Sequence, residues 1–456
     1  MFTRDILPKL ELWAVSAERK PLVVRGARQV GKTVAVKLFG ERFERFIYLN
    51  LDLPGESDIF RRRLPVQETF QAILIKSRIP QTEGRTLLFL DEIQNCPEAV
   101  EALRYFHEDL PEIHVVAAGS LLEIALHEKH VSFPVGRAEH HFLYPLTFRE
   151  FLSAIEAGEA VKAFDTIPMP AYAYEALMDY FHQYALIGGM PEVVAKYIEK
   201  NDVTALNKIY DSLLVSYQDD AAKYARNPTM ATILHHCIET APFVAGQRIT
   251  FSGFGQSNYR SREVGEALHT LQRAMLINLL YPSTSVEIPI MPDLKKSPRL
   301  QLLDTGLLNY FAGLQEQHYH HDNLHAFYKG MLAEHIVGQE LIAMESNTRK
   351  KQCFWVRGKS QSHAEVDFLV QHKGYVVPVE VKSGSAGRLR SLHQFMERCP
   401  HWYAVRMYAG PLEIQQVKSP TGKRFYLLNL PYFLASVVYE YLEWMMEEYH
   451  RPPETG

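Results

Sequence analysis

The sequence predicts an α/β protein of more than one domain, on three observations. A glycine-containing loop at 26–33 lies between an apolar run and a helix-permissive segment, an apolar run at 86–92 ends in two carboxylates, and two apolar runs within 365–382 flank a short turn. Strand and helix segments that alternate in this way are typical of a parallel sheet whose ligands bind at the carboxyl ends of the strands. The 456 residues are enough for two or three domains.

The composition excludes several classes of protein. The formal net charge is −4 at pH 7, so no overall basic field favours nucleic acid, and such a contact would need a local patch. The first residues lack an apolar signal-peptide core, and no stretch stays apolar for the length of a membrane span. We therefore expect a cytoplasmic protein with no membrane partner. A reducing compartment, without a zinc module or disulfide framework, is predicted by four cysteines that lack C-x-x-C spacing, namely Cys96, Cys237, Cys353 and Cys399.

The loop at 26–33 fits the pattern G-x-x-x-x-G-K-[ST] between a strand and a helix. Gly26 and Gly31 let the backbone turn with its N–H groups inward, which makes a nest for phosphate oxygens at the positive end of a helix. We expect Lys32 to reach the β- and γ-phosphates of ATP and the Thr33 hydroxyl to ligate Mg²⁺. A glycine turn that matches by chance is the alternative. The predicted cofactor-binding residues are Gly26, Ala27, Arg28, Gln29, Val30, Gly31, Lys32, Thr33 and Val34.

The apolar run at 86–92 delivers two adjacent carboxylates at its end. Such a pair suits an ATPase, because Asp91 can hold the Mg²⁺ shell while Glu92 polarises the attacking water. The next predicted strand, 113–120, ends in the hydroxyl of Ser120, which is expected to sense the γ-phosphate. The alternative for 86–92 is a buried strand with a polar end.

With these elements in place, the sequence resembles the AAA+ ATPases, and within them a prokaryotic family with the P-loop G-A-R-Q-V-G-K-T and the Walker B segment L-D-E-I-Q. The resemblance extends over nearly the whole chain. It implies catalytic roles for Ser120 as a sensor-type residue and for Arg137 as a γ-phosphate sensor or arginine finger. It also implies a homo-oligomer, while a surface salt bridge is the alternative for Arg137. Further matching segments are A-G-S-L-L at 118–122, V-G-R at 135–137, Y-P-L-T-F-R-E-F at 144–151 and G-G-M-P-E at 188–192.

A helical lid is predicted after the sheet. Segment 146–200 has a helical pattern that is interrupted at Gly188 and Gly189, and we expect it to pack on the nucleotide site. Hinge motion about the two glycines, linked to the nucleotide, is a hypothesis. The predicted AAA+ domain with its lid spans 1–200.

A winged-helix middle domain is predicted at 201–315. There a helix with apolar Val264, Leu268, Leu271 and Met275 on one face precedes a strand-like segment, and the resembled family has a winged helix here. The region is locally basic, and Arg260 and Arg262 stand at the start of the helix. Phosphate contact with DNA and contact with protein are both open interpretations.

The C-terminal part, predicted as a domain at 316–456, is expected to carry a hairpin with a turn at 372–374. Alternation places Glu380 and Lys382 on one face of a strand, and Asp367 can lie across from them on the paired strand. Two carboxylates and a lysine so placed suit Mg²⁺ binding and water activation for phosphodiester hydrolysis. A hairpin with alternating exposed charges is the alternative.

This part resembles the PD-(D/E)XK nuclease fold, an α/β restriction-endonuclease-like fold. Asp367, Glu380 and Lys382 stand at the motif positions, so the resemblance implies catalytic roles for all three, with Asp367 and Glu380 as metal ligands. Glu334 stands where that fold often carries a further acidic ligand. Val366 replaces the proline of the pattern.

Three functions follow, namely an ATPase motor or switch, an ATP-gated nuclease that acts on DNA or RNA, and a nucleotide-dependent binding scaffold. The first is an ATP-binding AAA+ ATPase that couples Mg²⁺-dependent hydrolysis to movement of the winged-helix and nuclease-like domains, with DNA or RNA as an open partner and nuclease activity as an open question. The alternative is a nucleotide-dependent binding scaffold whose nuclease-like domain is catalytically inactive.

Overall fold

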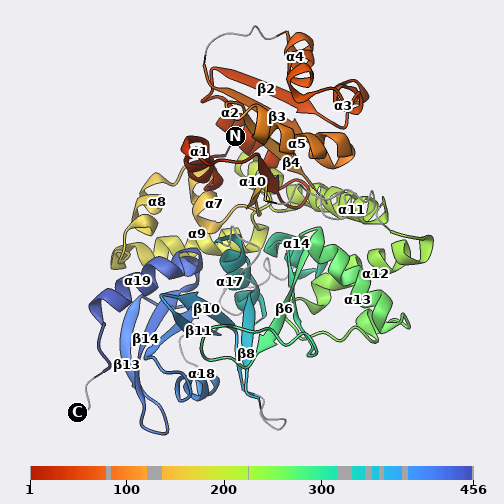
Figure 1. The fold of residues 1–456 in the computed structure, drawn as a ribbon. Coiled ribbons are helices and arrows are strands. Elements are labelled where there is room, and N and C mark those ends of the chain that lie inside the picture. The colour runs from red at the N-terminus through yellow and green to blue at the C-terminus, as the bar shows by residue number, and fades with distance from the viewer. Residues whose placement is uncertain are drawn as a thin grey trace. The chain divides into compact units, whose positions relative to one another are not determined.

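The computed structural model shows an α/β protein that forms two compact units (Figure 1). Unit 1 comprises Met1–Pro145, Ser212–His235 and Glu266–Leu276, and unit 2 comprises Leu146–Asp211, His236–Gly265 and Ile277–Gly456. The predicted domain boundaries after residues 200 and 315 stay predictions. The structure describes residues 2–78, 84–120, 136–223, 225–315, 331–344, 352–358, 364–382 and 389–453.

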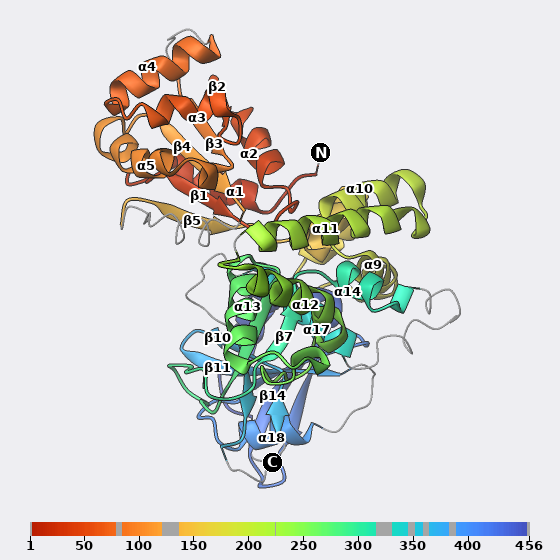
Figure 2. The same cartoon turned by 90° about the vertical axis from the view of Figure 1, so that its right-hand side faces the viewer.

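Unit 1 contains a five-stranded sheet in the order β2-β3-β4-β1-β5, in which every neighbouring pair is parallel (Figure 2). β3 and β4 are buried along their whole length, as expected for apolar central strands of a parallel sheet. The predicted parallel sheet is therefore confirmed. The strands are β1 (Leu22–Arg25), β2 (Arg45–Asn50), β3 (Thr86–Asp91), β4 (His114–Gly119) and β5 (Glu139–Phe142).

Helices cover both faces of this sheet. On one face, side chains of α3, α4 and α5 pack with Leu88 and Leu90 in one apolar core. Phe89 lies between them in the sequence and points to the other face, where it stacks on Phe46. On that face α2 comes so close that a β-carbon on Gly40 would lie 2.4 Å from the Phe46 ring. The helices of this part are α1 (Ile6–Val15), α2 (Lys32–Gly40), α3 (Pro54–Arg61), α4 (Val66–Ser77) and α5 (Pro97–Asp109).

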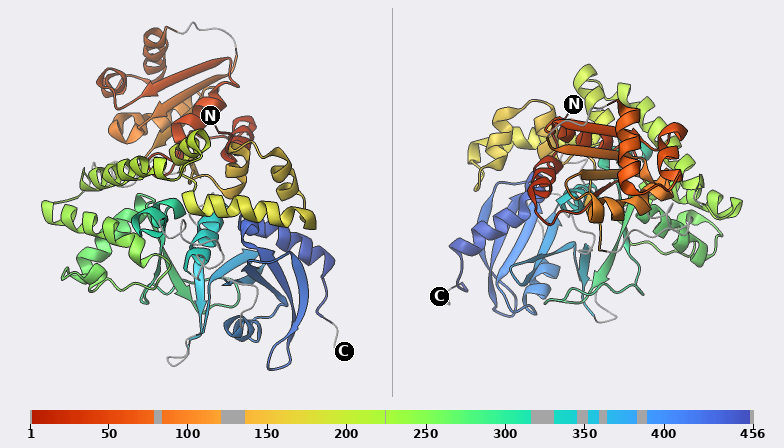
Figure 3. Two further views of the ribbon diagram at one scale, coloured as in Figure 1. Left: turned by 180° about the vertical axis from the view of Figure 1, so that it is seen from behind. Right: turned by 45° about the horizontal axis from the view of Figure 1, so that its top comes forward.

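Unit 2 contains a mixed five-stranded sheet in the order β10-β11-β12-β14-β13, drawn in blue at the C-terminal end of the colour range (Figure 3). β10 and β11 pair as the predicted hairpin, with Phe368 opposite Val379, while β11, β12 and β14 run parallel. The hairpin prediction is confirmed. The strands are β10 (Phe368–His372), β11 (Tyr375–Lys382), β12 (Tyr403–Tyr408), β13 (Glu413–Lys418) and β14 (Arg424–Pro431).

A second sheet of unit 2, in the order β7-β6-β8-β9, draws its strands from two predicted domains. β6 (Ile277–Ser283) and β7 (Arg299–Leu302) come from the predicted winged-helix region, and β8 (Cys353–Val356) and β9 (Glu365–Val366) come from the predicted nuclease-like region. β6 pairs antiparallel with β7 and parallel with β8. β7 and β9 are the two outer strands of this sheet, and the long side chain of Arg299 in β7 reaches Asp367, the residue after β9, at 3.2 Å.

An apolar core of unit 2 includes side chains from both of these sheets. Trp355 of β8 is fully buried and meets Phe395 of α18 (Arg390–Met396) at a ring-centroid distance of 5.4 Å. The same cluster includes Leu369 of β10 and Leu427 of β14. Burial of such large side chains in one cluster makes each sheet depend on the other for stability.

Helices occupy the predicted helical stretch 146–200, as expected. They are α7 (Phe148–Ala154), α8 (Gly158–Asp165), α9 (Tyr174–Ile187) and α10 (Pro191–Lys200). The later helices are α11 (Asn207–Lys223), α12 (Pro228–Val244), α13 (Ser261–Arg273), α14 (Thr305–Phe311), α17 (Met331–Met344) and α19 (Val438–Glu448). Within the described ranges, no helix has both the length and the apolar character needed to cross a membrane.

One detail of the predicted winged-helix region is corrected. Val264, Leu268 and Leu271 are buried positions of α13, but Met275 lies beyond the end of the helix. The backbone of Met275 is left-handed, with φ of 60°, and the N–H of Leu276 donates to Leu271 O at 3.0 Å. This is the usual hydrogen-bond pattern of a helix that ends in a left-handed residue.

Gly188 and Gly189 are packed closely against other parts of unit 2. A β-carbon on Gly188 would lie 2.1 Å from Asp304 Oδ1, and one on Gly189 would lie 2.1 Å from Leu146 O. The N–H of Gly189 also donates to Asp304 Oδ2 at 2.6 Å. The close packing leaves no room for a side chain at either position, which is a sufficient reason for glycine at both. Hinge motion about the two glycines stays a hypothesis.

A buried polar network connects α17 with α9 and the start of α7. Glu340 Oε1 accepts a hydrogen bond from Tyr184 Oη at 2.6 Å and from the N–H of Phe148 at 3.2 Å. Gln339 Nε2 donates to the same Tyr184 hydroxyl at 2.9 Å. Burial raises the pKa of Glu340 to about 7, so this carboxyl favours its protonated form in the folded protein.

Replacing Glu340 with glutamine should raise stability at pH 8 and leave it nearly unchanged at pH 5. The folded-state pKa lies above the ordinary value of 4.5, so the stabilising contribution of Glu340 is complete at low pH and is lost as the pH rises toward 7. The neutral amide avoids that loss, up to about 3 kcal/mol. Thermal unfolding of the wild type and of Glu340→Gln across pH 5–8 measures this difference in stability. An equal loss of stability in Glu340→Gln at pH 5 and at pH 8 would contradict the raised pKa of Glu340.

Candidate functional site

The loop between β1 and α2 folds as its glycines require. A β-carbon on Gly26 would lie 2.4 Å from Leu143 O, so a side chain there would collide with backbone. Gly31 has φ of 94° and Gln29 has φ of 65°, both in the left-handed region that glycine adopts most easily. The loop ends at Lys32, where α2 begins, and the first N–H groups of that helix lie at the loop.

Lys32 carries a buried charge inside this loop. Its Nζ donates to Gly26 O at 3.0 Å and to Ala27 O at 2.8 Å, and both acceptors are neutral carbonyl oxygens. Burial lowers the pKa of Lys32 to about 8, although the charges of Glu92 and Asp91 act in the opposite direction. Within the part of the chain that the structure describes, this ammonium has no carboxylate at hydrogen-bond distance. A phosphate would supply that anion, so the loop fits a phosphate chemically.

Thr33 and Asp91 lie together at the carboxyl end of the sheet. Thr33 Oγ1 donates to Asp91 Oδ2 at 2.8 Å, and Tyr48 Oη donates to the same oxygen at 3.2 Å. A hydroxyl and a carboxylate oxygen in contact are donors of the kind that Mg²⁺ takes in nucleotide sites. The residues present therefore fit the predicted ion.

Glu92 follows Asp91 in a left-handed backbone conformation, with φ of 52°. A non-glycine residue in this conformation costs on the order of 1 kcal/mol, and such strain is concentrated at functional positions. The N–H of Glu92 donates to Asp91 Oδ1 at 3.1 Å, and its carboxylate accepts a hydrogen bond from the Gln94 amide. These contacts hold both predicted carboxylates at the end of β3.

Ser120 and Arg137 are the two remaining residues with predicted catalytic roles in this domain. Ser120 follows β4 and is buried, and Leu121, Leu122 and Val135 of the matching segments lie outside the described residues. Arg137 Nη2 lies 2.7 Å from Glu108 Oε1 of α5, which is the ion pair expected under the alternative interpretation. The sensor and arginine-finger roles stay predictions.

Two contacts at the loop were missed from the sequence. Arg28 Nη1 donates to both carboxylate oxygens of Asp220, at 2.6 and 2.7 Å, and Tyr217 Oη donates to Arg28 O at 3.3 Å. Both partners are on α11, nearly two hundred residues away, and no local pattern signals them. Tyr48 was also missed, although its position near the end of the strand beside β3 was a usable signal.

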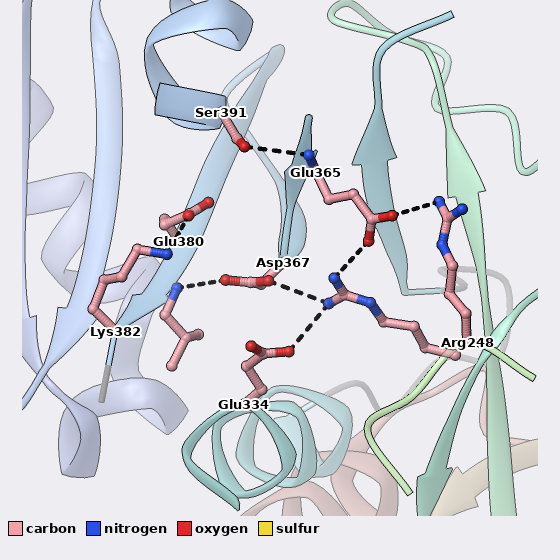
Figure 4. Close-up of polar contacts among 9 residues, drawn as sticks. Arg248, Glu334, Glu365, Asp367, Glu380, Lys382 and Ser391 are labelled. Carbon is pink, nitrogen blue, oxygen red and sulfur yellow. Dashed lines mark hydrogen bonds and ion pairs between the residues drawn. The ribbon is translucent and has the colours of Figure 1, made fainter. Parts of the chain in front are cut away.

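The predicted acidic residues of the C-terminal part also come together (Figure 4). Lys382 Nζ lies 2.5 Å from Glu380 Oε1, and Asp367 Oδ2 accepts a hydrogen bond from the N–H of Val381 at 2.8 Å. Glu334 of α17 faces the same place. We name Glu334, Glu365, Asp367 and Glu380 the carboxylate cluster.

Arg299, at the start of β7, contacts three members of the carboxylate cluster. Its Nη1 lies 3.2 Å from Asp367 Oδ1 and 3.3 Å from Glu334 Oε2, and its Nη2 lies 2.8 Å from Glu365 Oε2. Arg248 Nη2 lies 3.0 Å from the other oxygen of Glu365. The sequence analysis did not assign a site role to Arg299 or Glu365.

Burial and mutual repulsion act on the cluster carboxyls. Burial, and after it the charge of Asp367, raises the pKa of Glu334 to about 8 and that of Glu380 to about 7, although the charges of Arg299 and Lys382 act in the opposite direction. Among the described residues, no three acidic, histidine or cysteine side chains are grouped so that they could hold a metal ion. The cluster as it stands does not fit the predicted Mg²⁺, and the ligand set Glu334, Asp367 and Glu380 stays a prediction.

Family models match three successive parts of the chain. Residues 18–152 match a family described as an AAA domain. Residues 178–318 and 329–431 match two families that are each described as a domain of unknown function. None of the curated proteins compared matches the sequence.

Solved structures resemble the chain only distantly. The Walker-type ATPase of Pyrococcus abyssi is 16% identical over 68% of this chain and 96% of that one, with a TM-score of 0.43. The Holliday junction branch migration motor RuvB of Thermotoga maritima is 17% identical over 64% and 93%, with a TM-score of 0.29. The ORC2 protein of Aeropyrum pernix, solved in ADPNP and ADP complexes, is 12% identical over 70% and 94%, with a TM-score of 0.28.

All three TM-scores are below 0.5, so we draw no conclusion about function from these likenesses. The family model covers the sheet β1–β5, the loop at 26–33 and both carboxylates of 86–92. Residues 18–152 of this chain are an AAA domain with a P-loop.

Proposed function

We propose that the protein is an ATPase that hydrolyses ATP in its AAA domain with Mg²⁺. The observation that carries this proposal is the buried ammonium of Lys32, whose acceptors among the described residues are two carbonyl oxygens, next to the contact between Thr33 and Asp91. An enclosed cation beside a hydroxyl and a carboxylate suits a metal-bound triphosphate better than it suits a structural turn.

The loop residues would bind and orient the nucleotide. Backbone N–H groups of 26–34 would surround the β-phosphate, and Lys32 would exchange its carbonyl acceptors for β- and γ-phosphate oxygens. Thr33 and Asp91 would hold Mg²⁺, Thr33 directly and Asp91 within its shell. When bound, the ion would neutralise charge on the phosphate oxygens.

Glu92 would orient and polarise the attacking water, since its carboxylate is held at the end of β3 beside Asp91. Ser120, at the end of the neighbouring strand β4, would contact the γ-phosphate. Arg137 would have to leave Glu108 to reach a phosphate, either in its own chain or in a neighbouring copy of a homo-oligomer.

The coupling of nucleotide binding to the rest of the chain would begin at Arg28. Its paired hydrogen bonds to Asp220 connect the phosphate-binding loop to α11, whose residues belong to both compact units. A loop that changes shape around ATP would therefore change its contact with α11. We propose that this contact transmits the nucleotide state toward the predicted winged-helix and nuclease-like regions.

A second candidate function is phosphodiester hydrolysis of DNA or RNA at the carboxylate cluster. It is favoured by Asp367, Glu380 and Lys382, which lie next to one another on the β10–β11 hairpin and the residue before it. Local basic residues such as Arg260 and Arg262 would contact phosphates. The alternative is a nucleotide-dependent scaffold with an inactive cluster, and the ion pairs of Arg299 favour it.

Glu92→Gln should keep ATP binding and lose turnover by about 10²-fold or more, because the amide cannot polarise water as a carboxylate does. Lys32→Ala should lose binding. Phosphate release with and without DNA or RNA, together with binding of a fluorescent ATP analogue, measures both effects. Lys162→Ala, at an exposed lysine of α8, is the control. Wild-type turnover in Lys32→Ala would refute the ATPase assignment.

Gly26→Ala should weaken ATP binding by about tenfold or more, since the added β-carbon meets Leu143 O and the loop must shift. The matched control is Gly158→Ala, because a β-carbon there meets nothing within 4 Å. Titration with the fluorescent ATP analogue gives the affinity, and thermal unfolding shows whether each variant is folded. A folded Gly26→Ala protein with unchanged affinity would remove the loop from the site.

Asp367→Asn should abolish any nucleic-acid cleavage that the purified protein shows with Mg²⁺ and ATP. The substitution removes a charge from the cluster but keeps the shape of the side chain and one oxygen acceptor for Val381. Gel assays with labelled single- and double-stranded DNA and RNA give the measurement. Equal cleavage by both proteins would indicate a contaminant, and no cleavage by either would favour the scaffold.

A further inference from the structure

The guanidinium of Arg299 lies in the middle of the carboxylate cluster. Figure 4 shows Glu334, Glu365 and Asp367 turned toward one guanidinium group, which the distances of 2.8 to 3.3 Å assign to Arg299. These carboxylates come from two parts of the chain: Glu334 from α17, and Glu365 and Asp367 from β9 and the residue that follows it. The Arg299 side chain therefore connects β7 with both parts.

Arg299 is held firmly in this place. Its side chain is only 14% exposed, and its guanidinium lies over the Phe354 ring, 4.7 Å from the centroid. Arg248 lies over the same ring at 4.9 Å. Next to Arg299, Pro298 O accepts a hydrogen bond from the N–H of Ile249 at 2.9 Å, which fixes the backbone at the start of β7.

The cluster is nearly neutral without any ion. Four carboxylates face three cationic side chains, namely Arg299, Arg248 and Lys382. Buried carboxylates in such a group need positive charge nearby, and either side chains or a divalent cation can supply it. The side chains already do so here.

Arg299 and a divalent cation would compete for the same oxygens. Asp367 Oδ1 is engaged by Arg299 and Asp367 Oδ2 by the N–H of Val381, while Glu380 Oε1 is engaged by Lys382. Glu380 Oε2 is buried and has no hydrogen-bond partner among the residues that the structure describes. A divalent cation needs several oxygens at about 2.0–2.6 Å around one point, which a guanidinium among them prevents.

We propose that Arg299 is a positioning residue that blocks the carboxylate cluster against divalent cations, so that the cluster takes up metal only after this guanidinium is withdrawn. The proposal rests on the second candidate function, the metal-dependent site at Asp367 and Glu380. It explains why acidic residues of the right chemistry are assembled here without standing around a common point. Withdrawal requires a rotation of Arg299 or a movement of β7.

The test measures Mn²⁺ binding to the nucleotide-free, full-length protein by titration calorimetry. Every protein carries Asp91→Asn, so that the AAA domain lacks the carboxylate that is predicted to hold its own metal ion. Arg299→Gln should bind Mn²⁺ at least about tenfold more tightly than the parent, because the competing charge is gone. Adding Asp367→Asn should remove that binding.

Two further variants test whether the gain in Mn²⁺ affinity is specific to Arg299. Arg248→Gln removes an arginine that pairs with Glu365 alone, and its Mn²⁺ affinity should stay near that of the parent. Glu365→Gln removes the shortest contact of Arg299 without altering a predicted metal ligand, and it should give a smaller gain. This variant carries the test if Arg299→Gln does not fold, since thermal unfolding identifies the folded proteins.

The outcomes distinguish the blocking role of Arg299 from the metal site at Asp367 and Glu380. Equal Mn²⁺ affinity in the parent and Arg299→Gln, with dependence on Asp367 in both, would overturn the blocking role and leave the metal site standing. No binding that depends on Asp367 in any folded variant would overturn the metal site and the blocking role together. The same gain in Arg248→Gln as in Arg299→Gln would show a general charge effect and would also overturn the specific role.

Discussion

The parallel pairing of β3, β4 and β1 is the constraint on which the candidate nucleotide site depends. Because these strands run in the same direction, their carboxyl ends reach one edge of the sheet, and the loop at 26–33, Asp91 and Ser120 are delivered there together. The buried faces of the strands fix the register, since a shift by one residue would turn apolar side chains away from both helical layers. The contact between Thr33 and Asp91 follows from that register.

In unit 2, charge interactions rather than strand direction determine which side chains come together at the carboxylate cluster. The unit's two sheets share an apolar core around Trp355, but their edges meet at buried charges rather than at apolar side chains. A buried charge left alone is costly, so each carboxylate there must find a cation or a proton. This cost favours one arrangement of the charged side chains over others. It also makes the carboxylate cluster sensitive to any cation that can replace an arginine.

Local interactions determine the features that the sequence predicted. The loop at 26–33, the carboxylates of 86–92 and the hairpin at β10–β11 are each specified by residues close together in the chain, and the hairpin and parallel sheet are confirmed. A period of two predicted that Glu380 and Lys382 share a face, and their contact agrees with it.

The remaining features depend on segments far apart in the chain. Arg299 among the carboxylates and Glu340 beneath Tyr184 arise from tertiary packing, which no local pattern encodes. Likewise, the sheet β7-β6-β8-β9 combines strands from two predicted domains, because strand pairing is decided by burial and not by proximity in sequence. Met275 shows the limit of helical periodicity, because the apolar pattern continues past Arg273, where the helix ends, to the left-handed residue Met275.

The pairing of Arg28 with Asp220 has a consequence for how the AAA domain can be isolated. Unit 1 is discontinuous, and the segment Ser212–His235 belongs to it although more than sixty residues of unit 2 intervene. A fragment cut anywhere between the sheet and α11 would leave Arg28, in the loop at 26–33, without its carboxylate partner. An arginine without that partner can pair with other anions, so anion affinities measured on such a fragment would not be those of the intact chain.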